Sequence, residues 1–115
     1  MGADHRNKVE RYISIWNLPD EDRRARMEEV FTEDVFYADP TVVTRGRAEL
    51  TEYIGRTARR FEGMRFSVPG PVDGHHDQVR FVWHCGAPGK GPVITGFDVA
   101  LFDGDHIKAI YGFFD

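Results

Sequence analysis

Asp98 is the residue whose surroundings most strongly indicate chemistry. It lies inside the apolar segment 93–102. The alternation of side chains along a strand places it on one face with small and apolar neighbours, among them Gly96 and Ala100. A carboxylate on such a face is costly to bury unless it is paired, hydrogen-bonded or protonated. We therefore interpret Asp98 as an acid in a pocket; the alternative is a buried carboxyl satisfied by a Tyr, a Trp or backbone groups.

Asp39 is the second candidate, because it directly precedes Pro40 at the end of the short apolar segment Val35–Ala38. A residue before proline is driven toward extended geometry, which places Asp39 at a strand end. Asp-Pro is also ordinary turn chemistry. Beside a pocket, however, the same carboxylate would serve as a proton acceptor.

Tyr12 and Trp16 lie one helical turn apart in a helix expected over about Asp4–Trp16. With Val9 and Ile13 they form an apolar stripe at helical spacing, for which core packing is the ordinary role. A buried phenol and a buried indole N–H nevertheless both need hydrogen-bond partners, and Asp98 is a possible partner for either.

The histidines do not add to the candidate catalytic residues. His84 alternates with Phe81 and Trp83 in the segment 78–85, so it points away from the aromatic face and is not expected to be a catalytic base. The run 75–77 (His-His-Asp) is interpreted as a polar hairpin, because adjacent strand residues point to opposite faces and do not converge on one ion. No phosphate-binding glycine motif follows a strand, so we expect neither metal nor cofactor.

The bulk properties indicate one soluble domain. The chain has 115 residues, of which 41% are apolar, and a net charge of −4, which argues against nucleic acid as a partner. The arginines at 56, 59 and 60 are interpreted as the solvated side of a helix. The single Cys85 excludes an intrachain disulfide, and no apolar run reaches transmembrane length. Since residues 1–17 are too polar for a secretory signal, we expect a cytoplasmic protein without a membrane partner.

The elements that must position these residues divide into a helical first half and a strand-rich second half, which predicts an α+β fold. We expect a mostly antiparallel sheet, strongly bent and closed by three helices, with a funnel between the layers. One segment, 65–72, should be a bulged or edge strand because of Pro69 and Pro71, followed by a turn near Asp73-Gly74. The predicted helices cover about 4–16, from Glu21 to about Phe31, and 47–61; the predicted strands cover 35–38, 65–72, 78–85, 93–102 and 107–114.

The order of these pieces resembles the nuclear transport factor 2-like superfamily, in particular its SnoaL-like branch. The resemblance covers nearly the whole chain. It implies one domain over 1–115, a cone in which three N-terminal helices pack on a strongly curved sheet that encloses a pocket. The segments that carry it are Arg11–Asn17, Tyr37–Pro40, Arg45–Arg47, Phe97-Asp98 with Phe102–Gly104, and Tyr111–Phe114.

Within that superfamily the polar residues are similar to those of ketosteroid isomerase, which pairs an Asp base with Tyr and a protonated Asp around the enolate oxygen. The resemblance puts Asp39 at the base and Tyr12 and Asp98 at the oxygen. SnoaL-like polyketide cyclases are resembled about as well, with Asp98 as the acid for aldol-type ring closure. The absence of an Arg-x-Asp pair argues against the epoxide hydrolases of this fold.

These observations lead to one main hypothesis and two others. The main one is an isomerase or cyclase that moves a proton next to a carbonyl of a small hydrophobic molecule. The second is a binding domain without turnover, in which Asp98 anchors a polar group. The third concerns assembly: a homodimer through the outer sheet face, where Val82, His84, Val99 and Leu101 would otherwise be exposed. The residues expected to shape the pocket are Trp16, Tyr53, Phe61, Phe81, Trp83, Phe102, Ile110 and Phe114.

Overall fold

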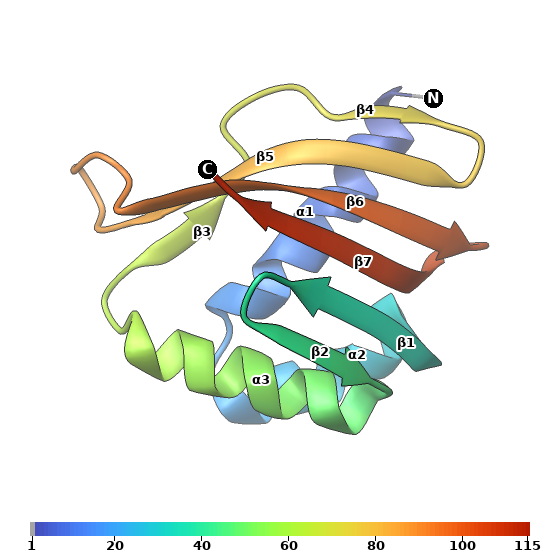
Figure 1. Cartoon of the computed structure of the whole chain (residues 1–115), viewed down its shortest axis with the longest axis horizontal. Coiled ribbons are helices and arrows are strands. Elements are labelled where there is room, and N and C mark those ends of the chain that lie inside the picture. Colours follow the sequence, from blue (N-terminus) through green and yellow to red (C-terminus); the bar gives the residue numbers. More distant parts are fainter. Residues whose placement is uncertain (1) are drawn as a thin grey trace.

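The computed structural model describes residues 2–115 and confirms the α+β prediction: three helices pack on a curved, open sheet (Figure 1). Met1, part of the predicted domain, lies outside the described residues. The helices are α1 (Gly2–Asn17), α2 (Asp20–Val30) and α3 (Arg47–Arg60). The strands are β1 (Phe31–Asp39), β2 (Val42–Arg45), β3 (Arg65–Ser67), β4 (Asp73–His75), β5 (Gln78–Gly86), β6 (Ile94–Asp103) and β7 (His106–Phe114).

The sheet runs in the order β2-β1-β7-β6-β5-β3, and β4 pairs with β5 outside this path. All of these pairs are antiparallel except β1 with β7, which is parallel. The parallel pair brings the first strand beside the last, so residues far apart in the chain meet at the centre of the sheet.

The helices cover one face of the sheet, and α1 and α3 do so through apolar stripes. Val9, Tyr12, Ile13 and Trp16 of α1 are all buried, as the spacing predicted. In α3, Leu50 and Ile54 are likewise buried and face the sheet. Burial of these side chains is the main favourable term in holding the layers together.

Two polar contacts fix the end of α1. The buried guanidinium of Arg23 donates to the carbonyl oxygens of Ile15 and Leu18 and pairs with Asp20 at 2.6 Å, which satisfies a charge that burial would otherwise penalise. Asn17 exchanges two hydrogen bonds with the backbone of Phe66, 2.9 and 2.8 Å long, and so holds β3 against the helix. Both contacts help to shape the space between α1, α3 and the sheet.

Some predicted boundaries were wrong. β1 already begins at Phe31, which is fully buried and pairs with Ile107, and β2 was not predicted at all. The segment 65–72 is not one strand: pairing stops after β3 and resumes at β4, because Pro69 and Pro71 have no N–H to donate. The turn that follows lies at residues 76–77, since Asp73 and Gly74 belong to β4.

None of the helices over residues 2–115 combines the length and the apolar character needed to span a bilayer.

Candidate active site

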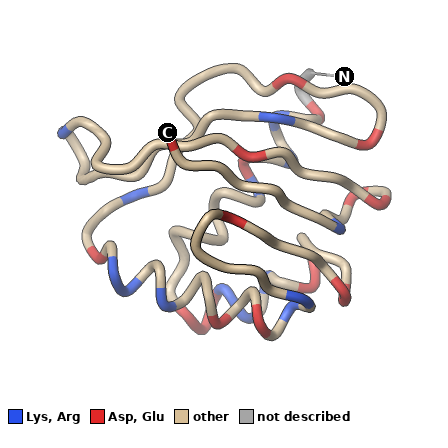
Figure 2. Tube along the Cα trace, in the orientation of Figure 1, with Lys and Arg blue, Asp and Glu red and all other residues tan. Residues whose placement is uncertain are grey.

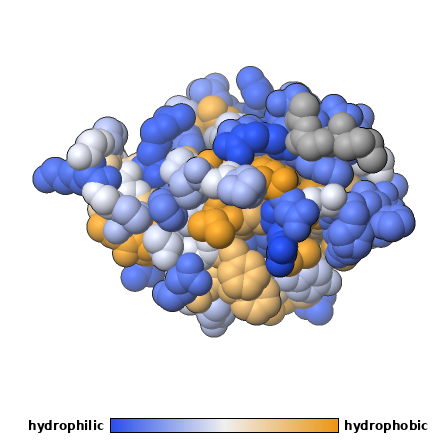
Figure 3. Space-filling model, turned by 90° about the horizontal axis from the view of Figure 1, so that it is seen from above, coloured by the Kyte–Doolittle hydropathy of each residue, from blue (hydrophilic) through white to orange (hydrophobic). Residues whose placement is uncertain are grey.

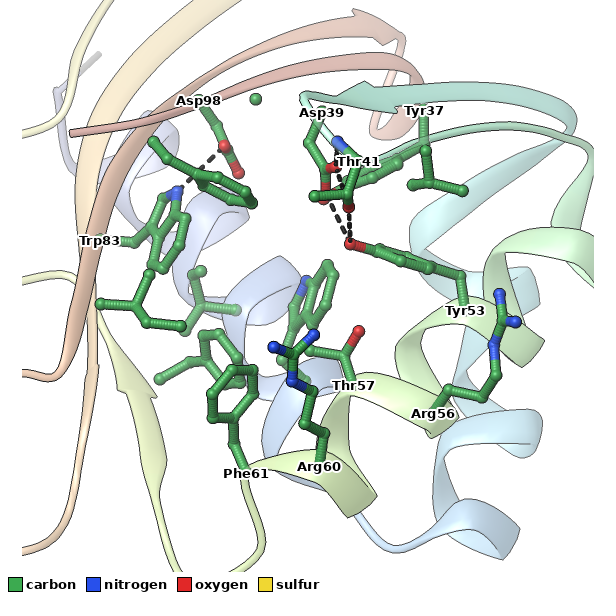
Figure 4. A pocket seen from close by; sticks show the side chains of 17 residues that line it. Tyr37, Asp39, Thr41, Tyr53, Arg56, Thr57, Arg60, Phe61, Trp83 and Asp98 are labelled. Carbon is green, nitrogen blue, oxygen red and sulfur yellow. Dashed lines mark hydrogen bonds between the residues drawn. The ribbon is translucent and has the colours of Figure 1, made fainter.

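A cavity of about 480 Å³ lies between α1, α3 and the concave face of the sheet (Figure 4). Its wall is mainly aromatic and aliphatic, with a small number of polar groups, the composition typical of small-molecule sites. The lining residues are Ile13, Trp16, Tyr37, Asp39, Thr41, Val42, Tyr53, Arg56, Thr57, Arg60, Phe61, Phe66, Trp83, Ile94, Asp98, Gly112 and Phe114.

Sheet register places two of these residues, Asp39 and Asp98, on either side of Gly112. Asp98 on β6 pairs directly with Gly112 on β7, and Ala38 on β1 pairs with Tyr111, so Asp39 comes level with Gly112 from the other side. A Cβ atom at position 112 would lie 2.9 Å from Asp98 Oδ1 and 3.4 Å from Asp39 Cβ. The space between the two carboxyl groups therefore depends on the missing side chain.

The carboxylate of Asp39 accepts four hydrogen bonds from three neighbours. Tyr37 and Tyr53 donate their hydroxyls to Oδ2 at 2.6 and 2.7 Å. Thr41 donates its backbone N–H and its hydroxyl to Oδ1, both at 2.8 Å. Burial raises the pKa of both tyrosines, so they act as neutral donors near pH 7. The carboxylate is thus held in one orientation at the cavity wall (Figure 4).

Asp98 is in a different environment. Its side chain is 5% exposed, and its one direct hydrogen bond in the described chain is from the Trp83 indole, 3.1 Å to Oδ1. Burial raises the pKa of Asp98 to about 7, the charge of Asp39 acts in the same direction, and the Trp83 hydrogen bond opposes both. Its carboxyl is turned toward the cavity (Figure 4). The raised pKa favours the protonated form of Asp98, which can donate a hydrogen bond into the cavity.

Two residues of α1 carry buried donors near this site. The Tyr12 hydroxyl and the Trp16 indole N–H have no hydrogen-bond partner among the residues the structure describes. Trp16 lines the cavity, whereas Tyr12 lies one turn behind it, with ring centroids 6.4 Å apart. Burial, followed by the charge of Asp98, raises the pKa of Tyr12 well above its usual value, so it stays a neutral donor. Unsatisfied buried donors at a cavity are suited to a polar atom of a ligand.

Of the residues expected to shape the pocket, five line it: Trp16, Tyr53, Phe61, Trp83 and Phe114. The structure places Phe81, Phe102 and Ile110 in the core instead.

These three residues lie outside the cavity because the concave face of the sheet extends beyond it. Strand alternation assigns a side chain to this face but not to a place along it. α1 covers Phe81 through Tyr12, with ring centroids 6.2 Å apart, and Lys8 of α1 lies 4.9 Å from the ring of Phe102. Ile110 has no exposed surface.

Sequence reasoning missed several polar residues of the site. Tyr37 lies two residues before Asp39, on the same side of β1, and this spacing could have identified it. Thr41 follows Asp39 by two residues, the position whose N–H an Asp side chain binds in turns. The solvated arginines were predicted correctly as exposed, but Arg56 and Arg60 also line the cavity mouth.

The family model for the SnoaL-like domain matches residues 9–110 of the chain. No curated protein matches the chain significantly.

Solved structures of the same fold are numerous. A candidate isomerase of the SnoaL-like family from Agrobacterium tumefaciens is 29% identical, with a TM-score of 0.92 over 98% of both chains. A candidate ketosteroid isomerase from Kribbella flavida is 12% identical, with a TM-score of 0.73 over 99% of this chain and 79% of that one. A designed protein with a curved β-sheet is 18% identical, with a TM-score of 0.75 over 100% and 88% of the two chains. The latter two support the fold alone.

Proposed function

This chain belongs to the family of SnoaL-like domains, and on that premise we propose that it is an enolising enzyme: an isomerase or cyclase that moves a proton next to a carbonyl. The observation that carries the proposal is the pair of carboxyl groups facing one largely apolar cavity across Gly112. Their environments differ strongly, and such a difference assigns one group as base and the other as acid.

Asp39 is the base. It removes a proton from the carbon next to the substrate carbonyl, and the electron pair of the broken C–H bond moves into the enolate. Oδ2 must release one of its two hydroxyl partners to accept the proton. Tyr53 has an alternative partner, because its hydroxyl lies 3.2 Å from Thr41 Oγ1, so a small movement frees Asp39.

Asp98 binds the carbonyl oxygen of the substrate. In its protonated form it donates a hydrogen bond to the carbonyl oxygen, on which negative charge develops as the enolate forms. Trp16 adds an unused indole N–H at the cavity wall, whereas Tyr12, which the resemblance puts at this oxygen, lies behind Trp16. Trp83 keeps the Asp98 carboxyl in place through Oδ1. In an isomerase the proton then returns from Asp39 to another carbon. In a cyclase the enolate carbon attacks a second carbonyl, and the resulting alkoxide oxygen takes up the proton that Asp39 removed.

The walls favour a flat, apolar substrate body. Trp83 contacts Phe66 and Phe114 with ring centroids 5.9 and 6.1 Å away, and Trp16 contacts Phe66 at 5.3 Å. These rings exclude water from the reacting carbon and strengthen the interaction of Asp98 with the developing charge.

The decisive experiment is deuterium exchange, followed by NMR, of the acidic protons of β-tetralone in heavy water. The Asp39→Asn variant should lose about a hundredfold or more of the catalysed rate. Asp34→Asn is the matched control, because Asp34 is an exposed aspartate of the same strand. Full activity of the Asp39 variant would refute its role as base.

The alternative is a binding domain without turnover, and the same buried donors are compatible with it. Under that alternative, bulky ketones would bind but show no catalysed exchange, and Asp98→Asn would weaken binding while Asp39→Asn would matter little.

We also propose that two copies associate through the outer face of the sheet. Phe97 and Phe113 stack there with ring centroids 4.8 Å apart and are 38% and 48% exposed, beside the exposed Val82 and Tyr111. Of the residues predicted for this face, Val82 is exposed and His84, Val99 and Leu101 are half-buried. Seen from above, apolar side chains reach the surface within a border of hydrophilic ones (Figure 3). A second copy would cover this patch.

A further inference from the structure

We propose that the substrate carries a carboxylate remote from its reacting carbon, and that Arg56 and Arg60 bind this carboxylate at the mouth of the cavity. The inference rests on the proposed function, because it names the class of substrate for the same site. Its basis is the position, the free charge and the chemistry of the two guanidinium groups.

The position follows from α3. Tyr53, Arg56, Thr57 and Arg60 follow the spacing i, i+3, i+4, i+7, which places them on one side of a helix, and all four line the cavity. Figure 4 shows the guanidinium of Arg60 turned toward the cavity, with Arg56 one turn earlier along α3. The Tyr53 hydroxyl bonds Asp39. From Tyr53 to Arg60 the helix rises ~10 Å, so Arg60 is attached about two turns further along α3 than the tyrosine that bonds Asp39.

The two guanidinium groups have no acidic partner in the part of the chain that the structure describes. Their neighbour Arg59 pairs with Asp20 at 2.9 Å, on the other side of the helix. Within residues 2–115, neither Arg56 nor Arg60 forms an ion pair; the contact of Arg60 is with the ring of Phe61, 5.4 Å away, which is itself a cavity wall. A guanidinium spread over an aromatic ring keeps its N–H groups available at the ring edge.

The charge distribution makes this position unusual. The protein as a whole is negative, with a net charge of −4, and two carboxyl groups, those of Asp39 and Asp98, face the same cavity. Basic residues nevertheless gather along the C-terminal half of α3 (Figure 2). The exposed Glu62 follows this helix but does not line the cavity. A carboxylate of the substrate is therefore attracted to these arginines and repelled by Asp39, which favours binding with the carbonyl toward Asp39 and Asp98.

Guanidinium groups bind carboxylates through paired N–H donors, which adds orientation to attraction. A carboxylate held at the rim would fix the distance between the apolar body of the substrate and Asp39, and it would oppose a reversed binding mode. The neutral form of the same molecule would lose both effects.

Binding can be measured without turnover. The chain has two tryptophans, Trp16 and Trp83, and both line the cavity, so quenching of their fluorescence reports directly on occupancy. The probes are a β-tetralone whose aromatic ring carries a propanoate chain, and its methyl ester. The native protein should bind the acid about tenfold more tightly than the ester, equivalent to ~1.4 kcal/mol, with a preference that falls as salt is added.

The Arg56→Gln/Arg60→Gln double variant should lose this preference and keep its affinity for the ester. Arg26→Gln is the matched control, because Arg26 is an exposed arginine of α2 that does not line the cavity. Equal binding of acid and ester by the native protein would overturn the proposal. So would an equal loss of both ligands in the double variant, or no quenching by either compound. A preference for the acid without deuterium exchange of either probe would instead refute the enolising function and leave carboxylate recognition standing.

Discussion

The indole Nε1 of Trp83 donates a 3.1 Å hydrogen bond to Oδ1 of Asp98 from the neighbouring strand. The contact is diagonal, because Trp83 pairs with Gly96 and Asp98 pairs with Phe81. A Cβ atom at position 96 would lie 2.6 Å from the Trp83 ring, so the indole reaches Asp98 only because its cross-strand partner is glycine. The buried carboxyl of Asp98 is thereby oriented by one hydrogen bond, while the rest of its hydrogen-bonding capacity is left for a ligand.

The buried Asp98 should make stability depend on pH. Its pKa is raised from 3.8 to about 7 in the folded chain, so between these values the folded state binds more protons than the unfolded state. The free energy of unfolding therefore falls as pH rises through this window. Asp98→Asn removes the titration and keeps an acceptor for Trp83. As pH rises from about 4 to about 8, we expect the free energy of unfolding of the variant to increase by roughly 2–4 kcal/mol relative to that of the native protein.

Urea unfolding of both proteins at several pH values measures this difference directly. Subtracting one curve from the other removes the contribution of the remaining titratable groups. A difference that stays constant across the window would show that Asp98 titrates in the folded state as it does in the unfolded one.

The two tyrosines on Asp39 should differ in their effects. Tyr37 is buried with Asp39 as its hydroxyl partner, so Tyr37→Phe should cost about 1 kcal/mol of unfolding free energy. Tyr53 is half-exposed, so Tyr53→Phe should cost less. Each variant should reduce catalysed exchange by about tenfold with little change in KM, because Asp39 loses orientation and the apolar walls are retained.

Thermal unfolding and exchange kinetics on the same preparations test this pair. Tyr111→Phe is a suitable control, because Tyr111 is exposed on the outer face of the sheet. Unchanged exchange in both variants would separate these hydroxyls from the chemistry.

Association through the outer sheet face should depend on its aromatic pair. Phe97→Asp and Phe113→Asp place a charge in the centre of the exposed patch and should convert a dimer into a monomer, as measured by sedimentation velocity at micromolar concentration. Val93→Asp is the control, since Val93 is 59% exposed but precedes β6. A native protein that sediments as a monomer would refute the dimer.

The sequence by itself determined the fold class and identified Asp98 as a candidate acid. Apolar spacing in α1 and α3 identified the faces that pack on the sheet, because burial imposes the period of each element on the residues. Asp98 was conspicuous for the same reason: an ionisable group on a buried strand face has a free-energy cost that an apolar side chain does not have.

The tertiary structure alone decided which residues share the site. Phe81 and Trp83 follow the same alternation on β5, yet Trp83 lines the cavity and Phe81 lies under α1. Asp39 and Asp98 are far apart in the chain and meet because a parallel pairing of β1 with β7 sets Gly112 between them. The periodicity of side chains follows from local backbone geometry and can be read from the sequence. Which residues meet at the site depends instead on the order of the strands and on how far each helix extends over the sheet, and no local sequence pattern encodes these.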